Sequence, residues 1–168
     1  MRIMLDRLYF LSGILAAFFM ASIAVLVLSQ TIGRQLGVVI PSANTLAGFC
    51  VSASTFLGLA PTLNRGGHIR VRMLIEHLPG ALHKIFEVWC LGAGTAMSGY
   101  ATWWSINLVY GSISYGDVSP GLLAIPMWIP QLGMAIGLSI FTICLLDNLI
   151  RVLTGSSAAY RDHEDGEI

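Results

Sequence analysis

The sequence predicts an all-α membrane protein with four transmembrane helices and a short cytoplasmic interfacial segment between the second and third helices. Three observations support this fold class. Hydrophobic residues make up 55% of the 168 residues, and charged residues make up only 11%, whereas a soluble domain carries about a quarter charged residues. The charges lie between long apolar runs. These runs reach the length of about 20 residues that a helix needs to cross a bilayer.

The first two predicted spans differ in composition. Residues 8–29 contain twelve Leu, Ile, Phe or Val residues and no charge, and each such residue favours insertion by about 0.3–0.6 kcal/mol. Residues 45–63 contain only seven, together with glycine and hydroxyl residues and Pro61 near the end. Such a composition suits a helix that packs against other helices. A re-entrant or interfacial segment is the alternative interpretation of this second span.

The third predicted span, residues 85–110, carries several glycine, alanine and serine residues at spacings that bring small side chains onto one face. Trp103, Trp104 and Tyr110 form an aromatic group at its far end. Amphipathic aromatic rings favour the membrane interface. This pattern predicts a helix that ends near the membrane surface.

The fourth predicted span is residues 126–149. It opens with Pro126 and Trp128, and proline suits the start of a helix because its missing N–H would have no partner there. Trp128 is expected to anchor this helix at the interface. Gly133 and Gly137 are four residues apart, a spacing that permits close approach of a second helix.

Basic residues predict the orientation. With four crossings, eight of the nine Lys and Arg residues fall on one side and only Arg34 falls on the other. Basic residues are enriched on the cytoplasmic side, so both termini are predicted to be cytoplasmic, and residues 30–44 and 111–125 are predicted to face outward. If the second span did not cross, the best split would be seven against two, so the bias favours four crossings. The eight residues are Arg2, Arg7, Arg65, Arg70, Arg72, Lys84, Arg151 and Arg161.

The domain organisation follows from these spans. Residues 1–155 are predicted to form a single four-helix transmembrane domain. Residues 156–168 are polar and acidic, and they are predicted to be a disordered cytoplasmic tail because they cannot bury apolar surface.

The predicted spans hold no ionisable residue near their centres, because Glu87 and Asp147 fall near the cytoplasmic ends of the third and fourth spans. A self-contained ion-coupled transporter usually places such residues at membrane depth. The spans also lack histidine ligands for haem, the three cysteines lack a metal-binding spacing, and no catalytic motif is recognisable. We therefore expect no enzyme activity, no cofactor and no metal site. Zero net charge gives no reason to expect nucleic-acid binding.

Two connecting segments carry the most distinctive residues. Residues 64–79 combine Arg65, His68, Arg70 and Arg72 with an interrupted apolar pattern, which predicts a short segment along the cytoplasmic membrane surface. The arginines are expected to anchor the topology by contact with anionic lipid, which stabilises by about 1 kcal/mol each. His68 is a candidate for capping a carbonyl or contacting a partner.

The outward segment before the fourth span contains Asp117, followed by Ser119-Pro120 and then Ile125-Pro126-Met127-Trp128. A turn and a helix start explain most of this stretch. Together with the run GGHIRV at residues 66–71 and the Leu-Pro pair at residues 78–79, it resembles the signatures of the small membrane subunit (Q-type, DctQ-like) of TRAP, or tripartite ATP-independent periplasmic, transporters.

Two further positions bear on the resemblance. Arg34 matches a position that is commonly basic in that family. The family often has an acidic residue at the start of the second helix, where this sequence has Asn44, a candidate helix cap. The ion pair that such an acid would make is therefore not expected here.

The resemblance implies a function. Such a chain would be the small permease subunit that scaffolds a large membrane subunit in sodium-coupled, binding-protein-dependent uptake of an organic acid. Its partners would be that large subunit, a periplasmic substrate-binding protein and membrane lipids, in a bacterial inner membrane. The candidate partner or topology contacts are Arg34, Asn44, Arg65, His68, Arg70, Arg72, Asp117, Pro126 and Trp128.

Two other hypotheses stay open on the sequence. A self-contained small oligomeric transporter would transport solute without a partner, but it would need an ionisable residue at membrane depth. A membrane assembly or anchoring protein would have no role in transport. Transport by the purified chain favours the first alternative, and a missing large partner favours the second.

Overall fold

The structure, a computed structural model, describes residues 2–38, 40–65, 80–120 and 123–154. These residues form four long helices: α1 (Arg2–Gln35), α2 (Ala43–Asn64), α4 (Gly80–Tyr115) and α5 (Trp128–Leu153). The described residues contain no strand beyond an isolated bridge between Val118 and Pro126. The all-helical prediction is confirmed. The predicted interfacial segment within residues 66–79 and the predicted tail at residues 156–168 lie outside the described residues.

Three of these helices are long and apolar enough to cross a membrane: Met4–Gln35 within α1, Ala43–Asn64 and Trp128–Leu153. The 36 residues of α4 would extend about 54 Å, more than the hydrocarbon core of about 30 Å. However, α4, which contains glycine, hydroxyl and aromatic residues and Glu87, is not one of these three candidate spans. The fourth crossing therefore stays a prediction.

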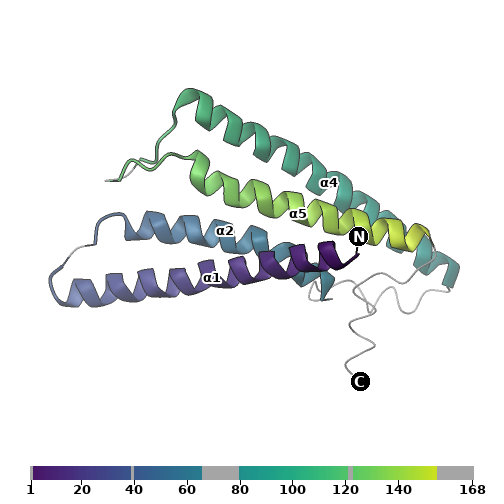
Figure 1. The fold of residues 1–168 in the computed structure, drawn as a ribbon, viewed down its shortest axis with the longest axis horizontal. Helices are drawn as coiled ribbons and strands as arrows, with labels where there is room; N and C mark the ends of the chain where they lie inside the picture. Colours follow the sequence, from purple (N-terminus) through teal and green to yellow (C-terminus); the bar gives the residue numbers. More distant parts are fainter. Residues whose placement is uncertain (1, 39, 66–79, 121–122, 155–168) are drawn as a thin grey trace, which may run out of the picture.

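The helices pack in the order α1, α2, α5 and α4, and the N-terminal part of α1 crosses in front of α2 in the view of Figure 1. Each helix packs against the next one in this order, and α1 also has a small contact with α5. Consecutive helices of the chain, α1 with α2 and α4 with α5, run in opposite directions, whereas the contacting pair α2 and α5 run in the same direction (Figure 1). In this order α2 and α5 are the central helices, and α1 and α4 are the two edges.

The directions of the four helices give the array two distinct ends. The start of α1, the end of α2, the start of α4 and the end of α5 lie at one end, which we call the terminal end (Figure 1). The connections between α1 and α2 and between α4 and α5 lie at the other end, which we call the connection end. This arrangement agrees with the predicted grouping of the connecting segments.

The two central helices approach closely at glycine residues. A Cβ atom on Gly137 of α5 would lie 2.5 Å from the carbonyl carbon of Phe56 in α2 and 2.8 Å from the nitrogen of Leu57. A Cβ atom on Gly133 would lie 3.0 Å from the Cβ atom of Ala53. Because real Cβ atoms essentially never approach within 3.0 Å, the backbones can pack at this distance only when residue 137 is glycine.

Hydroxyl groups link the outer pairs. The Ser54 hydroxyl of α2 donates a hydrogen bond of 3.1 Å to the carbonyl of Ala16 in α1. Between α4 and α5, the Thr142 hydroxyl lies 3.0 Å from that of Thr102 and 3.2 Å from that of Ser98. Such bonds between membrane helices stabilise by about 0.6 kcal/mol each, so they add to the packing rather than replace it.

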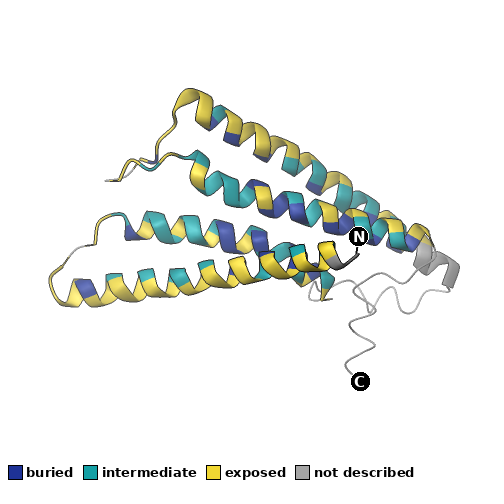
Figure 2. Cartoon of the chain, in the orientation of Figure 1, coloured by how far each residue is buried: buried dark blue, intermediate teal, exposed yellow. Residues whose placement is uncertain are grey.

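Burial is concentrated between the helices, and much apolar surface stays exposed (Figure 2). Phe10, Phe18 and Val25 on α1 and Trp89 and Met97 on α4 are examples of large exposed apolar side chains. A monomeric soluble protein rarely exposes so much contiguous apolar surface. This surface requires lipid or other membrane helices around it.

Candidate functional site

The predicted contact residues separate between the two ends of the array. Arg34, Asn44, Asp117, Pro126 and Trp128 lie at the connection end, and Arg65 lies at the terminal end. His68, Arg70 and Arg72 lie outside the described residues.

Arg34 and Asp117 are exposed at the connection end. Arg34 stands in the last turn of α1, next to Gly33, where a Cβ atom would lie 2.9 Å from the carbonyl oxygen of Val38. Both backbone polar groups of Asp117 form hydrogen bonds. Its N–H donates to the carbonyl of Ser112 at 3.1 Å, and its carbonyl accepts from the N–H of Met127 at 2.9 Å. Neither side chain forms a salt bridge with another described residue. Both charges are therefore presented on a fixed backbone.

The two connections are tied together beside these residues. The backbone N–H of Leu123 donates to the Ser42 hydroxyl at 3.2 Å, which links the segment before α2 to the segment before α5. Within the second connection, the N–H of Ser119 donates to the carbonyl of Ile125 at 2.8 Å. The bond between Leu123 and Ser42 connects the two halves of the array at this end.

The α5 start differs by two residues from the predicted one. Pro126 lies before the helix, where it pairs with Val118 in the isolated bridge, and α5 begins at Trp128. Pro126 accepts a hydrogen bond from the N–H of Ile129 at 3.2 Å and needs no donor of its own. Trp128 is half-buried, so only part of its ring can reach an interface or a partner.

The expected capping role of Asn44 is wrong. The structure begins α2 at Ala43, and Ser42 is the N-cap residue with a left-handed backbone conformation, φ 62°. Asn44 is therefore the second residue of the helix, beyond the cap position, and it is exposed. Ser42 makes no side-chain cap bond either, because its hydroxyl accepts from Leu123 instead.

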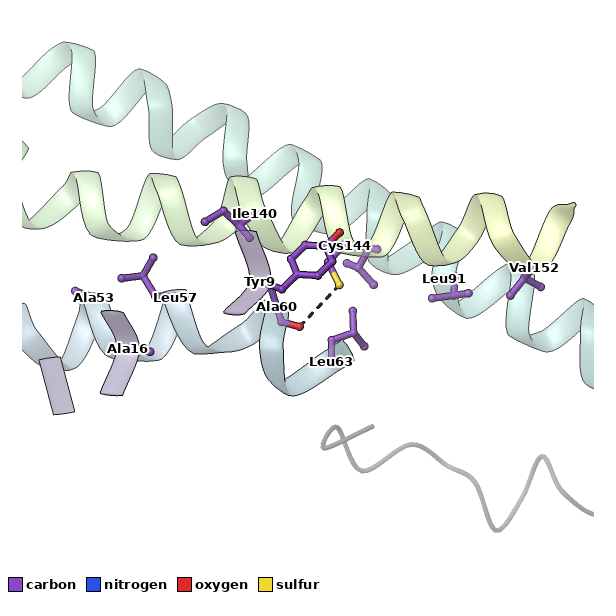
Figure 3. Packing of buried hydrophobic residues seen from close by; sticks show 11 residues of the cluster. Tyr9, Ala16, Ala53, Leu57, Ala60, Leu63, Leu91, Ile140, Cys144 and Val152 are labelled. Carbon is purple, nitrogen blue, oxygen red and sulfur yellow. Dashed lines mark hydrogen bonds between the residues drawn. The ribbon is translucent and has the colours of Figure 1, made fainter. Parts of the chain in front are cut away.

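A polar cluster that the sequence analysis did not predict lies in the core near the terminal end. Tyr9 is only 3% exposed, and its ring reaches across from α1 to lie beside Cys144 of α5 (Figure 3). The Tyr9 hydroxyl has no hydrogen-bond partner among the described residues. The Cys144 thiol is fully buried and lies 3.8 Å from the carbonyl of Ala60 in α2 (Figure 3). Tyr9 therefore links the first helix to α5, which α1 otherwise contacts little.

The last two turns of α5 complete this cluster. The Arg151 guanidinium forms a salt bridge of 2.9 Å with the Asp147 carboxylate, and Asn148, which is 1% exposed, donates to the carbonyl of Cys144 at 2.9 Å. The four-residue spacing of Asp147 and Arg151 is the signal that could have identified the ion pair from the sequence. The positive charge of Arg151 and the negative charge of Asp147 therefore compensate each other within α5.

Charged side chains in the described helices lie within about two turns of a helix end, as Glu87 in α4 and Asp147 and Arg151 in α5 illustrate. Among the described residues, no three His, Cys, Asp or Glu side chains are grouped so that they could hold a metal ion. What these helices do present is extended surface for contact with lipid and with other helices.

Comparison with known proteins identifies a family. The model of the family described as "Tripartite ATP-independent periplasmic transporters, DctQ component" matches residues 23–155. The match covers well over half of the chain and includes part of α1 and all of α2, α4 and α5. No curated protein sequence matches the chain.

Proposed function

This chain belongs to the DctQ component family of tripartite ATP-independent periplasmic (TRAP) transporters, and we propose that it scaffolds the large membrane subunit during uptake of an organic acid. In this proposal the large subunit holds the substrate and couples transport to sodium. A periplasmic binding protein delivers the substrate. The small subunit supplies a stationary wall for the moving parts.

The observation that carries the proposal is the array of four long helices with charges confined to its ends. The outer helices α1 and α4 leave surface on which another subunit can pack (Figure 1). Ion coupling usually relies on ionisable residues at membrane depth, and Asp147 is already paired with Arg151 near the end of α5. Coupling therefore fits a companion subunit better than this one.

The proposed topology has four crossings, with both termini in the cytoplasm of a bacterial cell. Support comes from the opposite directions of helices that follow each other along the chain (Figure 1) and from the excess of Lys and Arg in the segments of the terminal end. Under this topology, Arg65 and the predicted contacts His68, Arg70 and Arg72 would lie on the cytoplasmic side. There they would hold the chain against anionic lipid or dock the large subunit.

The two edges of the array differ in a way that suggests where the large subunit packs. The exposed face of α1 is aliphatic and phenylalanine-rich, as at Phe18 and Leu28. The exposed face of α4 carries Trp89, Tyr100 and Trp104. Their separations of 11 and 15 residues are close to whole numbers of turns, so these three side chains share one face.

These aromatic residues are too close together to occupy both membrane interfaces. Trp89 and Trp104 are separated by about 22 Å along the helix axis, less than the hydrocarbon core of about 30 Å, and any tilt shortens the separation across the membrane. At least one polar ring atom must therefore lie at hydrocarbon depth, where a protein partner can satisfy it and lipid cannot. This favours α4 as the edge that contacts the large subunit and α1 as the edge that faces lipid.

Arg34 and Asp117 are proposed to contact the binding protein, because both are exposed on a fixed backbone at the end proposed to face the periplasm. We expect Arg34→Glu to raise the concentration of binding protein that half-saturates uptake by about tenfold, which corresponds to about 1.4 kcal/mol. The maximal rate should not change. Uptake measured against binding-protein concentration tests this, and unchanged half-saturation would remove Arg34 from the interface.

A further inference from the structure

An open groove runs between α1 and α2 near the terminal end. Its volume is about 570 Å³, within the range of about 300–1,000 Å³ that is usual for small-molecule sites. Its lining is mainly apolar along the floor and polar at one end. The residues that define it here are Phe10, Gly13, Ala17, Gly58, Thr62 and Arg65.

Small residues create the groove. Gly13 packs beside Pro61, with its Cβ position 3.5 Å from the proline ring, and Gly58 packs beside Ala16 at 3.9 Å. Larger side chains at these positions would fill the space between the helices. Because Phe10 and Ala17 are seven residues apart, their wall of the groove extends about 10 Å along α1.

The polar end of the groove carries positive charge. Arg65 is exposed and forms no salt bridge with any described residue. Arg7 is also exposed and lies on the same face of α1 as Phe10. The antiparallel pairing of Gly13 with Pro61 places Arg7 and Arg65 within about one helical turn of each other. Asp6 is the one exposed acid on the described part of α1 near them, so the mouth is net positive.

This combination of an apolar floor and a cationic mouth is complementary to one kind of occupant. A phospholipid chain would lie along the groove, and its phosphate would accept hydrogen bonds from the Arg65 guanidinium. Guanidinium groups bind phosphate through parallel hydrogen bonds, and basic residues near a membrane surface attract anionic lipid. We propose that the groove between α1 and α2 binds an anionic phospholipid of the cytoplasmic leaflet, such as phosphatidylglycerol.

The assignment to the cytoplasmic leaflet depends on the topology proposed above, but binding itself does not depend on transport. Native mass spectrometry of the purified full chain in neutral detergent, titrated with phosphatidylglycerol or phosphatidylcholine, measures both affinities. The chain should bind phosphatidylglycerol about fivefold more tightly. Arg65→Gln should remove this preference. Ala17→Leu, which adds a side chain to the exposed floor, should weaken the binding of both lipids.

Two matched variants control for indirect effects. Arg34→Gln removes an exposed arginine from the other end of α1, and Ala24→Leu adds the same side chain to an exposed position outside the groove. Both should bind the two lipids as the unaltered chain does. Equal affinity of the unaltered chain for the two lipids would overturn the inference, and so would an unchanged preference in Arg65→Gln.

The remaining alternative occupant is a helix of the large subunit. A photoreactive side chain at position 17 in the assembled complex distinguishes the two. Attachment to phospholipid supports the inference, and attachment to the large subunit overturns it. Normal uptake without lipid preference would count against this inference alone. Normal lipid preference in a chain that does not support uptake would count against the proposed function alone.

Discussion

Replacing Gly137 with leucine is expected to separate α2 from α5 and to destabilise the folded chain by about 3 kcal/mol or more. A Cβ atom at this position would lie 2.5 Å and 2.7 Å from the carbonyl carbon and oxygen of Phe56. These are backbone atoms, so no rotation of a neighbouring side chain can relieve the clash. Gly137→Ala should cost about 1–3 kcal/mol. Thermal unfolding of the purified protein in detergent measures both effects.

The array supplies matched controls on α4. Cβ atoms built on Gly92 and Gly111 meet nothing within 4 Å. Gly92→Ala and Gly111→Ala should therefore keep or raise the stability, by up to about 1 kcal/mol, because alanine favours a helix over glycine. If Gly137→Ala unfolded at the same temperature as these controls, the close approach of α2 and α5 would be wrong.

Truncation of two aromatic side chains on α4 is expected to release the large subunit. Tyr100 is 68% exposed and Trp104 is 57% exposed, so replacing both with alanine should leave the array itself intact. Single truncations of aromatic anchors at interfaces cost about 2 kcal/mol or more. The double variant should therefore lower the yield of co-purified large subunit at least about tenfold.

The control for this variant is the opposite edge. Phe18→Ala with Leu28→Ala removes two exposed side chains from α1, 63% and 60% exposed, and should leave co-purification unchanged. Equal losses from both double variants would indicate general destabilisation. A loss of co-purification confined to the α1 variant would show that the large subunit contacts α1 and that the proposed contact with α4 is wrong. Unfolding temperatures of the two variants should match each other.

Sequence patterns predicted the helices well because apolar runs have a physical length set by the bilayer. The helices nevertheless extend beyond the predicted spans. The first span was predicted at residues 8–29, and α1 covers Arg2–Gln35, because backbone hydrogen bonding continues into the polar flanks. It ends just before Gly37, whose positive φ of 72° suits a glycine. The apolar run therefore predicts the segment inside the membrane, whereas the ends of the helix depend on where backbone hydrogen bonding stops.

Contacts between helices were harder to predict. The glycine pair at residues 133 and 137 indicated close packing, but the sequence did not say that its partner would be α2. Helix order in the array depends on shape complementarity across surfaces that are all apolar. For the same reason Tyr9, a single tyrosine near the start of an apolar run, gave no sign that it would reach Cys144 (Figure 3).

At the candidate contacts, local chemistry explains both the successes and the failure. Arg34 and Asp117 are exposed, as expected of charges that flank apolar helices. The Asn44 prediction failed because asparagine favours caps in general, whereas here the helix already starts at Ala43. The hydroxyl of Ser42, at the actual cap, bonds across to Leu123. That contact joins residues 81 positions apart, so no local pattern could have indicated it.

The most direct test of the account is solute accumulation in proteoliposomes with a sodium gradient and the binding protein outside. We expect this chain alone to accumulate none, and the chain together with its large subunit to accumulate solute. Accumulation by this chain alone would contradict the proposal that it is a scaffold.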